Sequence, residues 1–217
     1  MSNTENTRPT VALGIPTINQ KELLEEALQV YRQTFKNRHI FVVDNGNQGF
    51  QDEGSHLVFW CNGTNIGVAA SWNKIIERQS RLGYSHVLIL NDDVILHRKA
   101  REIEDFIFEN PADLYTGFGF YSFVMPLATY RKIGAFDELY YPAYYEDTDY
   151  QYRLQVAGCK TIDTDILLPE VLRKSKSGEK DPSLYNNVFQ CRKHYETKWG
   201  GPPTHEQYKT PYNQNNE

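Results

Sequence analysis

The sequence predicts an α/β sandwich with a mostly parallel central sheet. Short apolar runs alternate along the chain with segments whose apolar residues recur at helical spacing, as in successive strand–helix units. Turn-forming or polar residues follow the apolar runs, which is typical of strand ends. The length of 217 residues suits one domain with a core of its own, and a core of that size needs no disulfide or metal to hold it.

The first half of the chain supplies most of the predicted sheet. Residues 11–15 form a buried strand that Pro16 ends, and the segment that follows has helical spacing up to Phe35. Two more apolar runs, residues 39–43 and 56–60, predict the second and third strands.

The second half continues the alternation. Helical patterns predict helices at residues 67–82, 98–109, 127–133 and 146–157. Apolar or aromatic runs predict strands at residues 87–90, 117–125 and 161–167.

The polar ends of the chain set the predicted domain limits. Residues 1–9 are expected to be a polar tail, and residues 10–199 a single domain. The run Gly-Gly-Pro-Pro at 200–203 interrupts the pattern, so residues 200–217 are expected to form a polar C-terminal tail.

The composition excludes several classes of protein. Hydrophobic residues make up 40% and charged residues 24%, which is typical of a globular domain and not of a disordered or collagen-like chain. The net charge of −5 argues against a nucleic-acid partner, which would require a basic face. The sequence has no apolar run long enough for a membrane span and no signal-peptide pattern at its start. Together with an odd number of cysteines, 3, this predicts a cytoplasmic protein.

Polar clusters follow four of the predicted elements. They are Pro16-Thr17, Asp44-Asn45, Asn65-Ile66-Gly67 and Asn91-Asp92-Asp93. Ligands of open parallel sheets bind outside the carboxyl ends of the strands, so the four clusters predict one shared site.

Two acidic clusters are candidates for chemistry. Asp92 and Asp93 follow a wholly apolar strand and precede another apolar run, where uncompensated carboxylates are costly and a hard divalent cation would suit them. An ordinary turn or helix cap is the alternative. Glu146 and Asp147 begin a predicted helix behind the tyrosine-rich residues 140–145. They could deprotonate a hydroxyl, or they could only complement the helix dipole.

Glycines indicate where a ligand could approach the backbone. Gly67 precedes a predicted helix whose first turns contain Asn73, and a helix N-terminus favours anions. Close packing of that helix on the sheet is the other explanation. The sequence contains no P-loop, and residues 117–122 lack the third glycine of a dinucleotide-binding turn.

In combination these segments resemble the family-two type of GT-A glycosyltransferases, especially compact bacterial and viral transferases. The resemblance spans about residues 10–168 and rests on the following ordered motifs: Gly14-Ile15-Pro16-Thr17, Val42-Val43-Asp44-Asn45-Gly46, Asn65-Ile66-Gly67-Val68-Ala69-Ala70 ending at Asn73, Leu88-Ile89-Leu90-Asn91-Asp92-Asp93, and Ile133-Gly134-Ala135-Phe136-Asp137-Glu138 with Tyr145-Glu146-Asp147-Thr148-Asp149 and Arg153. It implies a GT-A (Rossmann-like) three-layer sandwich.

The resemblance also implies roles for individual residues. The implied donor-binding residues are Pro16, Thr17, Asp44, Asn45, Gly67, Asn73 and Asp92. Asp93 would be the direct metal ligand, and Asp147 the catalytic base with Glu146 beside it.

The chain departs from the family pattern after its last predicted strand. Many relatives have a third metal ligand there, often His, whereas this chain has Arg173, Lys174 and Lys176. Either His194 folds back to complete the metal site, or the metal has one protein ligand with phosphates and water. The three basic residues could instead bind the donor diphosphate.

A charge argument supports the metal. Six acids are expected in one cleft: Asp44, Asp92, Asp93, Glu146, Asp147 and Asp149. A diphosphate donor adds negative charge, and each like-charge pair at about 5 Å costs roughly 3 kcal/mol at an effective dielectric constant near 20. Donor binding should therefore need either a divalent cation, which we expect to be Mn²⁺ or Mg²⁺, or the basic residues Arg173, Lys174 and Lys176.

The resemblance, together with the charge argument for a metal, implies a hexosyltransferase-like enzyme. It would be metal-dependent and inverting, would take a nucleotide-diphosphate sugar, with a UDP-sugar expected, and would transfer the sugar to a glycan or another hydroxyl acceptor. The alternatives are a nucleotidyltransferase and a non-catalytic module that binds nucleotide sugars or carbohydrates.

Overall fold

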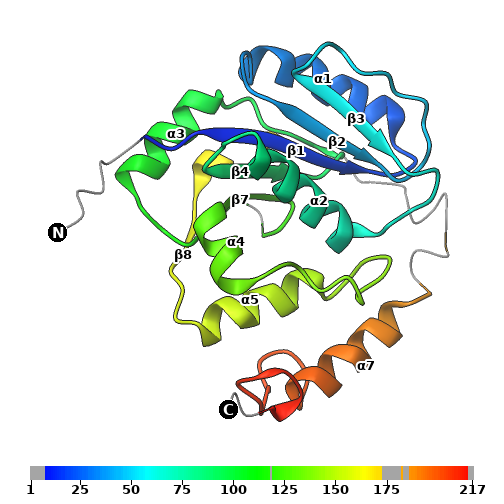
Figure 1. Ribbon diagram of the computed structural model, residues 1–217, viewed down its shortest axis with the longest axis vertical. Coiled ribbons are helices and arrows are strands. Elements are labelled where there is room, and N and C mark those ends of the chain that lie inside the picture. Colours follow the sequence, from blue (N-terminus) through cyan, green and yellow to red (C-terminus); the bar gives the residue numbers. More distant parts are fainter. Residues whose placement is uncertain (1–7, 118, 173–181, 183–185, 215–217) are drawn as a thin grey trace.

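The computed structural model describes residues 8–117, 119–172, 182 and 186–214. Within these residues one sheet has seven strands in the order β3-β2-β1-β4-β7-β6-β8 (Figure 1). Its strands are β1 (Val11–Thr17), β2 (Ile40–Asp44), β3 (Leu57–Cys61), β4 (His86–Leu90), β6 (Leu114–Thr116), β7 (Ser122–Pro126) and β8 (Thr161–Asp163). A second, two-stranded sheet pairs β5 (Val94–Ile95) with β9 (Val171–Leu172).

The main sheet is mostly parallel. Strand β1 lies between β2 and β4 and is parallel to both, and β2 is parallel to β3. Strand β7 is antiparallel to its neighbours β4 and β6, whereas β6 is parallel to β8. The carboxyl ends of all the main-sheet strands except β7 therefore lie at one edge, and we call this the carboxyl edge.

Helices cover both faces of this sheet (Figure 1). They are α1 (Lys21–Thr34), α2 (Val68–Arg81), α3 (Ala100–Glu109), α4 (Leu127–Ile133), α5 (Glu146–Val156) and α7 (Val188–Trp199), with 3₁₀ turns η1 (Asp165–Leu167) and η3 (Pro211–Asn213). One apolar cluster joins the sheet to α1 and α3, and another joins it to α2, α4 and α5. The predicted three-layer α/β sandwich is confirmed.

Alternation along the strands explains the two clusters. Leu88 and Leu90 of β4 lie in the first cluster, whereas Val87 and Ile89 lie in the second, because successive side chains point to opposite faces. Gly14 of β1 allows α2 to approach closely. A Cβ atom there would lie 2.0 Å from Cγ2 of Ile75.

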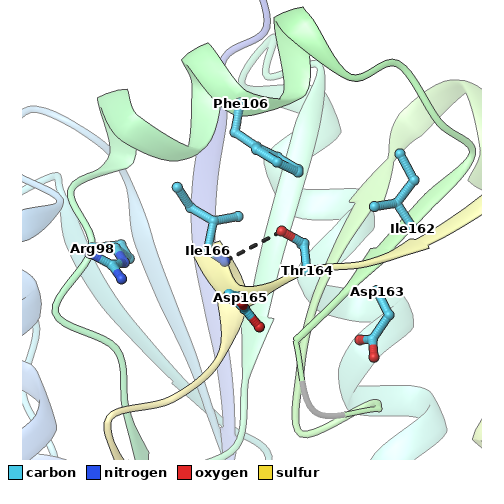
Figure 2. A pocket seen from close by; sticks show the side chains of 7 residues that line it. All are labelled: Arg98, Phe106, Ile162, Asp163, Thr164, Asp165 and Ile166. Carbon is cyan, nitrogen blue, oxygen red and sulfur yellow. Dashed lines mark hydrogen bonds between the residues drawn. The ribbon is translucent and has the colours of Figure 1, made fainter.

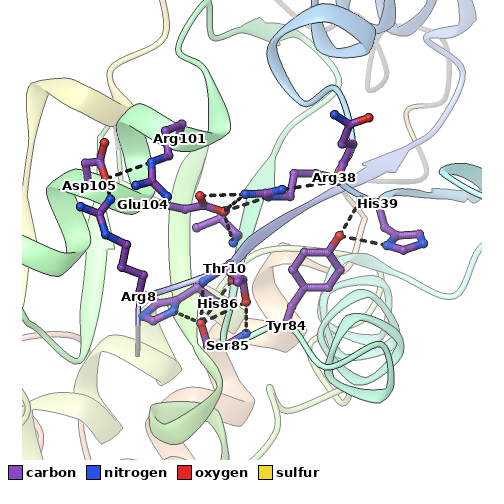
Figure 3. Close-up of polar contacts among 12 residues, drawn as sticks. Arg8, Thr10, Arg38, His39, Tyr84, Ser85, His86, Arg101, Glu104 and Asp105 are labelled. Atoms are coloured by element: carbon purple, nitrogen blue, oxygen red, sulfur yellow. Dashed lines mark hydrogen bonds and ion pairs between the residues drawn. The ribbon is translucent and has the colours of Figure 1, made fainter. Parts of the chain in front are cut away.

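A polar network closes the opposite edge of the sheet, where the strands begin. The buried carboxylate of Glu104 accepts hydrogen bonds from the backbone N–H of Val11 at 3.0 Å and from two guanidinium nitrogens of Arg38 at 2.9 Å each. The hydroxyl of Tyr84 lies 2.9 Å from Nδ1 of His39 (Figure 3). A buried carboxylate is tolerated when it is paired in this way. The network fastens α3 to β1 and β2 at the end of the molecule opposite the carboxyl edge.

Several elements differ from the sequence prediction. The strand expected at residues 117–125 is β7, and β6 precedes it. The strand expected at residues 161–167 ends at Asp163, because Thr164 caps a 3₁₀ turn by accepting from the N–H of Ile166. Helix α7 was not predicted.

Helix α7 and the residues after it contact the domain. Cys191, Tyr195 and Trp199 form a third apolar cluster with Tyr140 and Tyr152. The hydroxyl of Tyr152 also donates to the backbone carbonyl of Tyr208 at 2.7 Å. Residues beyond 199 thus pack on the domain. Among the described residues, no helix has both the length and the apolar character that a membrane crossing would require.

Candidate functional site

The predicted site residues of β1, β2 and β4 meet at the carboxyl edge. The backbone N–H of Asn45 donates to the carbonyl of Thr17 at 2.8 Å, which joins the ends of β2 and β1. The N–H of Ile18 donates to Oδ2 of Asp92 at 3.2 Å, which joins the ends of β1 and β4. Parallel pairing thus brings three clusters that are far apart in the sequence into one place.

Asp44 ends β2 and stabilises the turn that follows it. Its buried carboxylate accepts from the N–H of Gly46 at 2.9 Å, from the N–H of Gln48 at 2.6 Å and from the side-chain amide of Gln48 at 3.0 Å. The same amide lies 3.3 Å from the hydroxyl of Thr17. The sequence interpretation missed Gln48, although its place four residues after Asp44 in a turn is a usable signal.

Asn45 and Gly67 connect the carboxyl edge to the beginning of α2. The side chain of Asn45 donates to the hydroxyl of Ser71 and accepts from the N–H of Ile66, each at 2.9 Å. Gly67 has φ of +84°, and a Cβ atom there would lie 3.0 Å from the carbonyl oxygen of Pro142. That carbonyl accepts from the N–H of Val68 at 2.8 Å. Gly67 therefore permits close packing of Pro142 on the beginning of α2. The carbonyl of Pro142 occupies the N–H of Val68, which an anion could otherwise bind.

Asn73 holds a neighbouring loop. Its amide nitrogen donates to the carbonyl of Phe136 and to the carboxylate of Glu138, each at 2.9 Å. Its amide oxygen accepts from the N–H of Phe136 at 2.8 Å and from the hydroxyl of Tyr130 at 3.2 Å. All of its hydrogen-bonding capacity is thus directed to the protein, so we leave Asn73 out of the donor-binding residues proposed below.

Asp92 and Asp93 lie side by side after β4, and Asp92 is only 9% exposed. Burial, with a smaller effect of the Asp93 charge, raises the pKa of Asp92 to about 7, and a hydrogen bond from Thr17 partly opposes this rise. Two adjacent carboxylates, one of them costly to ionise, fit a hard divalent cation that would stabilise their charged forms. The described residues contain no group of three or more His, Cys, Asp or Glu that could hold a metal ion. A cation here would need oxygens from water or a ligand as well.

Glu146 and Asp147 begin α5 in different environments. Glu146 is 6% exposed, and its Oε2 atom has no hydrogen-bond partner among the described residues. Burial, with a smaller effect of the Asp147 charge, raises the pKa of Glu146 to about 8. Asp147 is partly exposed, and its Oδ1 accepts from the N–H and the hydroxyl of Thr148. At neutral pH Glu146 is therefore mostly protonated, whereas Asp147 is the accessible carboxylate.

The backbone just before these acids is strained. Tyr144 and Tyr145 have φ of 81° and 74°, a region that bulky residues rarely adopt. Such residues cost about 1–3 kcal/mol each and concentrate at functional sites. Here the conformation directs the N–H of Tyr144 toward the carboxylate of Glu146.

His194 and Asp149 both have partners within the protein. His194 on α7 has its Nε2 3.1 Å from Oδ2 of Asp137, and its ring meets that of Tyr140 edge-on at 4.8 Å. The structure thus gives His194 a partner other than the predicted metal. Asp149, also expected in the cleft, is wholly buried beneath it. Arg173, Lys174 and Lys176 lie outside the described residues.

A groove of about 620 Å³ lies between α3 and the end of β8 with the segment that follows it (Figure 2), and neither acidic pair described above lines it. Arg98, Phe106 and residues 162–166 line it. Strand β8 is the last strand of the sheet, and β7 and β6 separate it from β4. The groove is therefore distinct from the site at β1, β2 and β4.

The two raised pKa values predict an unusual pH dependence of stability. Between about pH 5 and pH 7 the native protein holds protons on Asp92 and Glu146 that the unfolded chain has already released, so these two groups lower the free energy of unfolding as pH rises. The lowered pKa of His86 acts in the opposite direction, but it is common to parent and variant. The expected contribution is on the order of 3 kcal/mol for each carboxylate. Urea unfolding of the metal-free parent and of the variant Asp92→Asn/Glu146→Gln should therefore diverge, with the variant gaining relative stability toward pH 8. If the free energies of unfolding of the parent and the variant change in parallel from pH 5 to pH 8, the burial argument is wrong.

Comparison with known proteins supports the fold. No family model matches the chain, and no curated protein matches it in sequence. The structure is similar to that of the mannosyltransferase PcManGT from Pyrobaculum calidifontis, which was solved with GDP-Man and Mn²⁺. The TM-score is 0.63 and the sequence identity 15%, and the match covers 91% of this chain and 67% of that chain. A putative nucleotide-diphospho-sugar transferase from Desulfovibrio desulfuricans G20 gives a TM-score of 0.49, 9% identity, and coverage of 72% and 80%. The chain has the GT-A type of fold that the sequence predicted.

Proposed function

We propose that this protein is a metal-dependent, inverting glycosyltransferase that takes a UDP-sugar and a hydroxyl acceptor. The observation that carries the proposal is two acidic pairs, each in a segment that contacts the ends of the central strands or the beginning of α2. Asp92 follows β4 and accepts from the N–H of Ile18 after β1, and Glu146 and Asp147 begin α5 shortly after the Tyr141–Pro142 segment that packs on Gly67. The mannosyltransferase of the same fold, solved with GDP-Man and Mn²⁺, supports a nucleotide sugar and a divalent cation.

The turn around Asp44 favours uracil over guanine as the base. An ionised carboxylate has about four acceptor positions, and Gly46 and Gln48 fill three of those on Asp44. One position is left for a single ring N–H, which uracil and thymine both have, whereas guanine presents adjacent donors. We therefore propose that Asp44 binds the uracil, with Pro16, Thr17 and Asn45 around it.

Asp93 would hold the cation and Asp92 would face the ribose or the donor sugar. When bound, the cation would supply positive charge to the leaving diphosphate. Asp92 would ionise as the cation arrives, because its raised pKa reflects burial that an adjacent positive charge would offset. Arg173, Lys174 and Lys176 are proposed to contact the diphosphate from the segment outside the described residues.

Asp147 would act as the general base. It would take the proton of the acceptor hydroxyl while that oxygen forms a bond to the anomeric carbon, and the bond from that carbon to the diphosphate oxygen would break on the opposite side. One displacement of this kind inverts the anomeric configuration. Glu146 is a poorer base at neutral pH because it is buried and mostly protonated.

A panel of nucleotide sugars tests the proposal. UDP-, GDP- and dTDP-sugars should be compared by thermal shift, each with and without Mn²⁺, and donor hydrolysis should be followed with the sugar that binds. We expect stabilisation by a UDP-sugar only with Mn²⁺, together with slow hydrolysis. Stabilisation by GDP-sugars alone would contradict the uracil assignment. Binding without hydrolysis or transfer to any hydroxyl acceptor would instead indicate a non-catalytic module.

A further inference from the structure

A buried lysine joins three segments beneath the acidic residues of α5. Lys198 of α7 is only 7% exposed. Its ammonium nitrogen lies 2.7 Å from Oδ2 of Asp137, in the loop before α5, and 2.7 Å from Oδ1 of Asp149, in the first turn of α5. A lysine is rarely buried unless its charge is paired, and here two carboxylates pair it.

Asp149 is fully buried and accepts hydrogen bonds on both oxygens. Its Oδ1 also accepts from the indole N–H of Trp199 at 2.8 Å and from the hydroxyl of Tyr140 at 3.3 Å. Its Oδ2 accepts from Nε of Arg153 at 2.9 Å. These donors come from α7, from the loop before α5 and from α5 itself, so Asp149 fastens the first turn of α5 to its surroundings.

The charges of this network are balanced. Asp137 and Asp149 carry two negative charges, and Lys198 and Arg153 carry two positive charges. Burial would raise the pKa of Asp137, but hydrogen bonds from Lys198 and His194 outweigh it and hold that pKa at about 2. Removal of Lys198 alone would therefore leave an uncompensated buried charge.

The network also reaches the donor side of the site. Asp137 lies between Phe136 and Glu138, which the side chain of Asn73 holds against α2. Helix α2 begins at the carboxyl edge, where Asn45 bonds to Ser71. Lys198 thus connects the loop that α2 holds with the turn of α5 that contains Asp147.

We propose that Lys198 is a positioning residue, which fixes the first turn of α5, and with it Asp147, relative to the carboxyl edge. This role rests on the proposed function of Asp147 as the base. Lys198 touches neither donor nor acceptor. It acts through Asp149, which lies two residues after Asp147. A displacement of about 1 Å in a reacting group can lower a rate about 10²-fold.

The test compares Lys198→Met with Lys193→Met. Both substitutions keep an unbranched apolar side chain, one atom shorter than lysine, and remove the charge, but Lys193 lies exposed on the same helix. We expect Lys198→Met to lower kcat about 10- to 100-fold and to leave the dissociation constant for UDP with Mn²⁺ within about threefold of the parent value. Lys193→Met should match the parent in both. A parental kcat in a folded Lys198→Met protein would overturn the proposal.

A double variant separates positioning from stability. Asp137→Asn/Lys198→Met removes one charge of each sign and should recover much of the melting temperature lost in Lys198→Met. If Lys198 positions Asp147, kcat should stay low in the double variant. Recovery of kcat together with the melting temperature would show that Lys198 only stabilises the fold. This variant also keeps the proposal testable if Lys198→Met does not fold.

Hydrogen exchange gives a readout that does not depend on activity. In the double variant the amides of residues 146–150 should exchange faster than in the parent, whereas those of residues 71–76 in α2 should be unchanged. Equal protection at residues 146–150 would overturn the positioning role even if no substrate is found. An inactive parent protein with the expected exchange pattern would instead count against the proposed glycosyltransferase activity alone.

Discussion

Asp147→Asn should lower turnover with a UDP-sugar by about 10²–10⁴-fold, the usual effect of losing a positioned general base. Asparagine keeps the size and the hydrogen bond to Thr148 but cannot take the proton of an acceptor hydroxyl. Affinity for the donor should remain nearly unchanged, because Asp147 begins α5 and lies outside the β1, β2 and β4 ends proposed to bind the donor. Steady-state kinetics and calorimetry with UDP and Mn²⁺ measure the two quantities.

Two further variants make this result specific. Asp165→Asn changes an exposed aspartate at the start of the 3₁₀ turn η1 and should leave turnover unchanged. Glu146→Gln should have a smaller effect than Asp147→Asn, since Glu146 is already mostly protonated at neutral pH. If Glu146→Gln abolishes turnover while Asp147→Asn keeps it, the two acids have exchanged roles.

The part of the site on β1, β2 and β4 could be predicted from the sequence because its signals are local. An apolar run followed at once by Asp44 or by Asn91-Asp92 predicts a strand end. Parallel order then requires these ends to lie at one edge. The contacts between Asn45 and Thr17 and between Ile18 and Asp92 confirm that they do.

Helix α7 could not be predicted from apolar spacing. Its buried face consists of Cys191, Tyr195, Lys198 and Trp199, which has helical spacing but includes a lysine. Hydrophobicity patterns place a lysine on the solvent-facing side of a helix. Only the three-dimensional positions of Asp137 and Asp149 explain why this one is buried.

Local sequence patterns also do not determine the direction of a strand or the partners of a polar side chain. Strand β7 is fully buried, and the same apolar run suits a parallel or an antiparallel neighbour. Asn73 was correctly placed near the beginning of α2, but its four hydrogen bonds go to residues 57 to 65 positions away. Such long-range partners decide whether a polar side chain faces a ligand or supports a loop.

Asp93→Ala should abolish the manganese-dependent part of donor binding while the protein stays folded. Asp93 lies after the end of β4 and is outside the apolar clusters, so its removal should leave no cavity in the core. Without the cation, the diphosphate would face Asp92 and the other acids of the site. One like-charge pair at about 5 Å costs roughly 3 kcal/mol at an effective dielectric constant near 20, which corresponds to a loss of affinity of at least about 10²-fold.

Calorimetry with UDP, with and without Mn²⁺, measures this loss. Asp163→Ala is the matched control, because Asp163 ends β8 at the same edge of the sheet but lies beyond β7 and β6. The control should bind UDP as the parent does, and its affinity for UDP should rise with Mn²⁺ as in the parent. Asp93→Ala should bind UDP equally weakly with and without the metal. If its affinity still rises with Mn²⁺ as in the parent, then Asp93 does not hold the cation, and Asp92, whose pKa of about 7 would fall as a metal binds, becomes the ligand to test next.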